Sequence, residues 1–122
     1  MRRPLAVVLL AGVLACSVPA EQGLVSDFFA ASRLRDLTAL SQLSTTIFEP
    51  GERGTVTRVS VERVSEERID GSSVLKDVTV DATLHRTDGS TAQAPLVLTL
   101  SRPNAESERD RLYGGWRVVA VR

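Results

Sequence analysis

The sequence contains one cysteine, one histidine and no excess of charge of either sign, since 15 Lys and Arg balance 15 Asp and Glu among 122 residues. A single cysteine cannot form an internal disulfide, and one cysteine with one histidine cannot supply the ligands of a conventional zinc site. The balanced charge also lacks the basic excess by which nucleic-acid-binding proteins attract phosphate. We therefore expect no metal, no cofactor and no nucleic-acid partner, and a domain stabilised by its hydrophobic core alone.

Long uncharged sequence occurs only at the N-terminus. Two arginines precede Leu5–Ala15, a run of eleven residues without a charge or a hydrogen-bonding side chain, and no charge follows until Glu21. The resulting 17 uncharged residues fall short of the roughly 20 that span a bilayer. A positive start, an apolar centre and a small-residue end are typical of a secretory signal. We expect residues 1–20 to be a signal peptide and residues 21–122 to form one domain; a transmembrane anchor is the alternative.

Two cleavage positions remain open at the end of this signal. Val13-Leu14-Ala15-Cys16 resembles the lipobox of bacterial lipoproteins, in which cleavage precedes the cysteine and the cysteine is acylated. The only cysteine of the chain lies where the apolar run ends, which favours this position and predicts lipidation at Cys16. Cleavage after Ala20, behind Val18-Pro19-Ala20, would instead release a soluble protein that begins at Glu21.

The resemblance to lipoproteins implies a location in the bacterial cell envelope. Ser17 follows Cys16, and under the sorting rule of such lipoproteins this implies an outer-membrane lipoprotein that faces the periplasm. The membrane is then a partner, contacted through the lipid anchor. Cleavage after Ala20 would leave a soluble periplasmic or secreted protein.

Helical spacing dominates the first part of the body. Apolar residues recur every three or four positions at Leu24, Phe28, Ala31 and Leu34. The next leucines step by three and would drift about 60° per step around a straight helix. We therefore expect a kink or a new helix start near Asp36, which is a good N-cap, and a possible first cap at Ser26. Helical spacing extends to Ile47, and Glu49-Pro50-Gly51 should end it.

Four strand candidates follow, at Thr55–Val64, Leu75–Thr87, Ala92–Ser101 and Trp116–Arg122. The second has the clearest alternation, with an apolar face made by Val78, Val80, Ala82 and Leu84. Asp88-Gly89 predicts a hairpin between the second and third strands, and Asp70-Gly71 predicts a similar turn between the first and second. The charged residues 103–115 predict a long exposed loop.

One apolar face per strand predicts a sheet that is covered on one side, and the helical segment is the only element available to cover it. Short connections favour an antiparallel meander in chain order. The expected fold class is therefore α+β: a kinked N-terminal helix, or a helix pair, packed on one face of a curved four-stranded antiparallel meander. Phe28, Phe29 and Trp116 are the large side chains expected to fill its core.

The last strand places Trp116, Val118 and Ala120 in one phase. The opposite phase leaves a mixed outer face with valines at Val97, Val119 and Val121. This outer sheet face is a candidate surface for a homodimer.

These elements resemble the nuclear-transport-factor-like superfamily. The resemblance is carried by Phe28-Phe29-Ala30-Ala31, by Arg35-Asp36-Leu37 and by Gly115-Trp116-Arg117-Val118 at the end of a meander. It covers about Leu24 to Arg122 and implies a cystatin-like α+β roll, as in ketosteroid isomerase and polyketide-cyclase relatives. Asp36 matches the acidic residue that caps a helix in that family. Many bacterial members are small exported lipoproteins.

Enzymes of that superfamily use Asp, His or Tyr as acid–base groups, which makes Asp77, Asp81, His85 and Tyr113 the candidates here. Strand alternation places the first three on the polar face, in water, where nothing would shift their pKa values toward catalysis. Too few ligands converge along one strand for a metal site. Tyr113, beside two glycines, should close the loop onto the core. We therefore assign no catalytic, cofactor-binding or metal-binding residue.

The expected function is that of an exported, lipid-anchored, non-catalytic domain that binds a protein partner or a small apolar ligand. The alternative is a small acid–base enzyme, an isomerase or dehydratase, that works in a helix–sheet pocket. A core filled by Leu, Val, Phe and Trp would favour the binding domain. A helix–sheet cavity lined by at least two ionisable groups would favour the enzyme.

Overall fold

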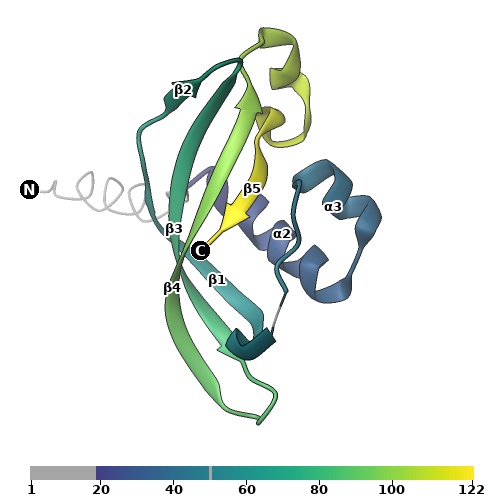
Figure 1. Cartoon of the computed structure of the whole chain (residues 1–122), viewed down its shortest axis with the longest axis vertical. Helices are drawn as coiled ribbons and strands as arrows, with labels where there is room; N and C mark the ends of the chain where they lie inside the picture. Colours follow the sequence, from purple (N-terminus) through teal and green to yellow (C-terminus); the bar gives the residue numbers. More distant parts are fainter. Residues whose placement is uncertain (1–18, 50) are drawn as a thin grey trace, which may run out of the picture.

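Two helices lie on one face of a curved antiparallel sheet in the computed structural model (Figure 1). The structure describes residues 19–49 and 51–122, without the side chain of Glu52. The helices are α2 (Glu21–Leu34) and α3 (Leu37–Leu43), and the strands are β1 (Thr55–Val64), β2 (Arg68–Asp70), β3 (Ser73–His85), β4 (Thr91–Pro103) and β5 (Arg117–Val121). Short 3₁₀ turns lie at η1 (Gly51–Arg53), η2 (Glu106–Asp110) and η3 (Leu112–Gly115). The predicted signal run and Cys16 lie outside the described residues.

The sheet has the order β1-β3-β4-β5, and every neighbouring pair in this order is antiparallel. The predicted α+β class, with a helix pair on one face of a curved antiparallel meander, is confirmed. The sheet has one strand more than predicted, because β2 pairs with the first residues of β3. Gly71, with φ of +62°, makes the tight turn between them.

The break between the helices lies where the leucine spacing predicted it. Arg35 ends α2 in a left-handed conformation with φ of 53°, and the Asp36 carboxylate accepts a hydrogen bond from the Ala39 N–H at 3.1 Å. This is the predicted N-cap of α3. The expected cap at Ser26 is wrong, because α2 begins earlier, at Glu21, and Ser26 lies inside it.

The second helix ends earlier than predicted, at Leu43 rather than near Ile47. Ser44 is extended and forms an isolated parallel bridge with Val118 of β5, and the Thr45 N–H donates to the Val118 carbonyl at 2.9 Å. β-branched residues at 45–47 favour extended backbone. The edge of β5 thus provides an acceptor for the Thr45 N–H, which a longer helix would have bonded to its own backbone.

Two β-bulges curve the sheet around α2. Register shifts in β1 fall between Val56 and Arg58 and between Val61 and Arg63. They bring onto one face four valines of β1 that are spaced by three, two and three residues: Val56, Val59, Val61 and Val64. These valines pair with inward residues of β3. Each bulge adds local twist and bends the strand. Part of the curvature therefore comes from β1, at the edge that α2 covers.

The edge of β1 is covered by side chains of α2. The Gln22 side-chain amide accepts from the Val61 N–H at 2.9 Å and donates to the Val59 carbonyl at 3.0 Å. Arg33 donates to the Val56 carbonyl at 2.9 Å. These bonds take the place of a neighbouring strand and leave less backbone open to pairing with another chain.

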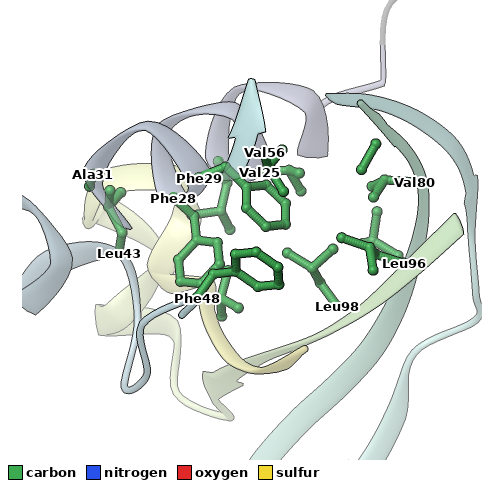
Figure 2. Packing of buried hydrophobic residues seen from close by; sticks show 14 of the residues in the cluster. Val25, Phe28, Phe29, Ala31, Leu43, Phe48, Val56, Val80, Leu96 and Leu98 are labelled. Atoms are coloured by element: carbon green, nitrogen blue, oxygen red, sulfur yellow. The ribbon is translucent and has the colours of Figure 1, made fainter. Parts of the chain in front are cut away.

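The core lies between α2 and the middle of the sheet (Figure 2). Phe28 and Phe29 are buried, as predicted, and their rings meet edge to face at 5.2 Å. Phe48, which the prediction left out, is also buried and packs edge to face on Phe29 at 5.3 Å. The extended chain after α3 carries it there. Trp116 is only partly buried at the border of the core, so its predicted place inside is corrected.

The last strand changes phase at a bulge, which breaks up the predicted valine surface. Leu100 pairs with Val118 but Thr99 pairs with Ala120, so one residue of β5 is extra. Val118 is fully buried, whereas Ala120 is exposed. Val121 pairs with the inward Leu98 and packs against the core. The prediction that placed Ala120 inside and Val121 on the outer face is wrong.

Candidate ligand-binding site

The acid–base candidates predicted on the second strand do not meet at a cavity. His85 is exposed at the end of β3, and Asp81 and Asp77 lie on the outer face of the sheet, away from the core. Among the described residues, no group of three or more His, Cys, Asp or Glu could hold a metal ion.

Asp77 joins strands on the outer face. It accepts hydrogen bonds from Thr99 at 2.9 Å and from Arg68 at 3.2 Å, and Arg122 lies 3.6 Å away. Burial raises the pKa of Asp77, but the hydrogen bonds from Thr99 and Arg68 and the nearby positive charges together lower it below its usual value. Its role is to link β2, β4 and the C-terminal residue to β3.

Two cations lie on the inner face of the sheet, where the prediction placed apolar residues only. The inward phase of β3 continues past Val78 to Lys76, and that of β4 continues past Leu100 to Arg102. Lys76 is 7% exposed and Arg102 is 9% exposed. Extending the predicted alternation by one step at the end of each strand would have found them.

Both cations lie against Trp116. The Lys76 ammonium is 4.1 Å from the centre of the indole ring, and the Arg102 guanidinium is 5.2 Å from it. A cation within about 6 Å of an aromatic ring is attracted by the negative ring face, more strongly when water is excluded. Trp116 therefore stabilises two buried positive charges at the border of the core.

Glu21, the first residue of α2, completes the group by pairing with Lys76 at 2.7 Å. Burial raises the pKa of Glu21, but the hydrogen bond and charge of Lys76, with a backbone hydrogen bond, together lower it below its usual value. The N-terminus of a helix also favours a carboxylate. Glu21 is therefore held in its ionised form.

These side chains line a cavity of about 250 Å³ between the start of α2, the inner face of the sheet and η3. Apolar walls come from Leu24, Leu100 and Trp116, and polar groups come from Glu21, Lys76 and Tyr113. Ala20 lies at the edge next to Glu21. Apolar walls with a few converging polar groups are typical of small-molecule sites.

Tyr113 forms one wall and attaches η3 to α2. Its ring lies over Gly23, where a Cβ atom would approach the ring to 3.1 Å, and its hydroxyl donates to the Asp27 carboxylate. Its backbone has φ of 56°, which is costly for a tyrosine. The Asp27 hydrogen bond, burial and the Asp27 charge raise the pKa of Tyr113 to about 12. The predicted closure of the loop onto the core agrees with this packing.

No protein-family model, curated protein or solved structure matches this chain. In residues 19–49 and 51–122, no helix is long and apolar enough to span a membrane.

The pKa values of the ionisable groups in this site are shifted in the opposite direction from those of an acid–base centre. Proton transfer at neutral pH works best with a pKa near the operating pH. Here the pKa of Glu21 is lowered and that of Tyr113 is raised, so both move away from neutrality. The arrangement is suited to holding charged and apolar groups of a ligand in place.

Proposed function

We propose that this protein is an exported, non-catalytic binding domain, anchored by lipid at Cys16 to the bacterial outer membrane and facing the periplasm, and that the Lys76–Trp116 cavity binds a small, largely apolar ligand. The observation that carries the binding function is the cavity itself, with the partly exposed Trp116 ring as its apolar wall beside a buried ammonium. We also propose that the domain is a nuclear-transport-factor-like roll, on the basis of the helix pair, the curved antiparallel sheet and the Asp36 cap.

The start of α2 supports cleavage before Cys16 rather than after Ala20. The Pro19 carbonyl accepts from the Gln22 N–H at 3.1 Å, and Ala20 lies at the edge of the cavity. Cleavage after Ala20 would remove both residues and place a charged amino group on Glu21. Cleavage before Cys16 leaves the helix start and the cavity intact.

Mass spectrometry of the processed protein tests the anchor. We expect a first residue at Cys16 with the added mass of acyl chains, and loss of that mass in the C16S variant. A mature chain that begins at Glu21, or an uncleaved chain, would contradict the anchor and leave the binding function to be judged separately.

Fluorescence tests the binding site, because Trp116 is the only tryptophan of the chain. Titration with short aliphatic ligands should change its emission in a saturable way. Ala20→Leu enlarges an exposed residue of the cavity and should weaken binding by filling it. The matched control is Ala105→Leu, at an exposed alanine outside this cavity. Emission that no aliphatic ligand changes would contradict the proposed site.

A second candidate is a small acid–base enzyme, because Glu21 and Lys76 are two ionisable groups that line a helix–sheet cavity. Its test is the exchange of α-hydrogens of small ketones with deuterated water, followed by nuclear magnetic resonance. Exchange that is faster with the wild-type protein than with Glu21→Gln would favour the enzyme. The filled core and the direction of the two pKa shifts favour the binding domain.

A further inference from the structure

We propose that the cavity recognises a single-chain amphiphile with one negative charge, whose anionic oxygen accepts hydrogen bonds from Lys76 while its chain lies against the ring of Trp116. The inference rests on the proposed function, because it takes this cavity as the binding site. It adds the sign of the ligand's charge and the form of its apolar part.

The sign follows from an imbalance of charge around Trp116. Lys76 has a carboxylate partner, Glu21, in direct contact. Arg102 has none within hydrogen-bond distance among the described residues: Glu67 lies 3.8 Å away and its side chain is 54% exposed. Arg102 donates instead to the Pro103 carbonyl at 3.3 Å. A buried cation without a close carboxylate favours an added anion nearby.

Lys76 is the group that a ligand can reach, since it lines the cavity. Its ammonium has three N–H donors, and in the described part of the chain Glu21 is its one hydrogen-bond acceptor. A carboxylate or phosphate oxygen in the cavity would accept another of these donors. Because Glu21 already neutralises Lys76, the nearby Arg102 charge makes the net charge around the cavity positive and disfavours a cationic head group.

The form of the apolar part follows from the walls and the size. Leu24 and Leu100 line the cavity but are only 1% and 0% exposed, so the partly exposed Trp116 ring is the apolar surface that a ligand contacts. A volume of about 250 Å³ is below the roughly 300–1,000 Å³ of sites for drug-sized ligands. One short aliphatic chain suits this space better than a fused ring system. An eight-carbon chain is therefore a suitable probe.

The test compares four probes on the exported C16S form of the whole chain, which cannot carry lipid at residue 16. Octanoate, 1-octanol and octylammonium share one chain and differ in charge, and acetate carries the charge without the chain. With the emission of Trp116 as readout, octanoate should bind at least tenfold more tightly than 1-octanol or acetate. Octylammonium should be the weakest of the three eight-carbon probes.

Variants identify the group that recognises the charge. Lys76→Met keeps the length of the side chain and removes its charge, so octanoate and 1-octanol should then bind equally. Arg58→Met, at an exposed arginine of β1, is the matched control and should keep the tenfold preference. Arg102→Gln leaves Lys76 in place and should reduce the preference about threefold; it serves as the second variant if Lys76→Met does not fold.

Two results would overturn the inference alone, and a third would also contradict the proposed binding site. If 1-octanol or octylammonium binds the C16S form as tightly as octanoate does, the negative charge is wrong and the cavity remains a binding site for apolar ligands. If acetate binds as tightly as octanoate, the chain contributes nothing and the amphiphile is wrong. If none of the four probes changes the emission of Trp116, the proposed binding site is contradicted together with the inference.

Discussion

The two ends of the inner sheet face differ although the same strands form both. Toward the Asp88-Gly89 hairpin, Val80 and Leu96 are buried and belong to the same hydrophobic cluster as the phenylalanines of α2 (Figure 2). Toward the other end, Lys76 and Arg102 continue the same inward phase and lie against Trp116. Alternation along a strand thus tells which face a side chain occupies. It does not tell whether other elements close over that face.

The difference has its cause in the length of the helical cover. α2 begins at Glu21, which already pairs with Lys76 across to the sheet. Beyond this point η3, attached through Tyr113, supplies the remaining wall. The closed end is therefore made by a helix and the open end by a short 3₁₀ turn, which leaves room for a cavity.

The largest effect is expected at the closed end. Phe28→Ala removes a fully buried ring and should lower the free energy of unfolding by about 3–5 kcal/mol. Chemical denaturation measures it. Leu112→Ala, at a leucine that is 55% exposed, is the control and should change it by at most about 0.5 kcal/mol. Equal losses for the two variants would contradict the position of the core.

The next effect concerns the edge of β1. Gln22→Ala leaves the Val59 carbonyl and the Val61 N–H without their amide partner, and it should lower the free energy of unfolding by about 1–3 kcal/mol. Gln42→Ala, at an exposed glutamine of α3, should have little effect. Hydrogen exchange adds a local measurement, because the Val61 amide should exchange faster in Gln22→Ala. An unchanged rate would show that Gln22 does not protect this edge.

At the open end, the ion pair should matter less for stability than for binding. The double variant Glu21→Leu/Lys76→Met should change the free energy of unfolding by about 1 kcal/mol or less at neutral pH. Apolar side chains in place of a buried ion pair often stabilise a protein as much as the pair does. In the wild type, the pair contributes its full stability at a pH above 4.5, the usual pKa of a glutamate. This contribution is lost as the pH falls through the lowered pKa of Glu21. The double variant should show a shallower loss of stability in acid. A slope equal to that of the wild type would contradict the pairing.

The smallest effect is spectroscopic. Tyr113 is the only tyrosine, so the absorbance of its phenolate reports one group, with a pKa of about 12. Asp27→Asn should move this pKa toward 10.0. Because the folded-state pKa is raised, the contribution of this bond to stability is present below pH 10.0 and is lost as the pH rises toward about 12. A titration that is the same with and without Asp27 would contradict the hydrogen bond.

Local signals in the sequence predicted much of the fold. Asp36 was recognised because a leucine step of three cannot continue on one helix face, and Asp88-Gly89 because both residues tolerate a tight turn. The bulges in β1 and β5 were not predicted, because strict alternation was used to assign residues to faces and an extra residue interrupts that alternation. Phe48 was missed because its place depends on the bridge from Ser44 to Val118, a contact distant in sequence.

The candidate site was not predicted, and the reason is physical. A lysine or arginine near the end of a strand is usually exposed, so the inward phase of Lys76 and Arg102 did not by itself predict that they are buried. Their burial depends on Trp116, which joins them from a distant strand end, and on Glu21, which lies at the boundary of the predicted signal. Only three-dimensional proximity brings these four residues together.

The position of the first turn of α2 has a consequence for ligand exchange. Ala20, at the rim of the cavity, is four residues beyond Cys16. Four residues span at most about 14 Å, even in a fully extended chain. If Cys16 carries lipid as proposed, so short a tether keeps the rim beside the head groups of the bilayer. An amphiphile would then transfer between membrane and protein without travelling through bulk water.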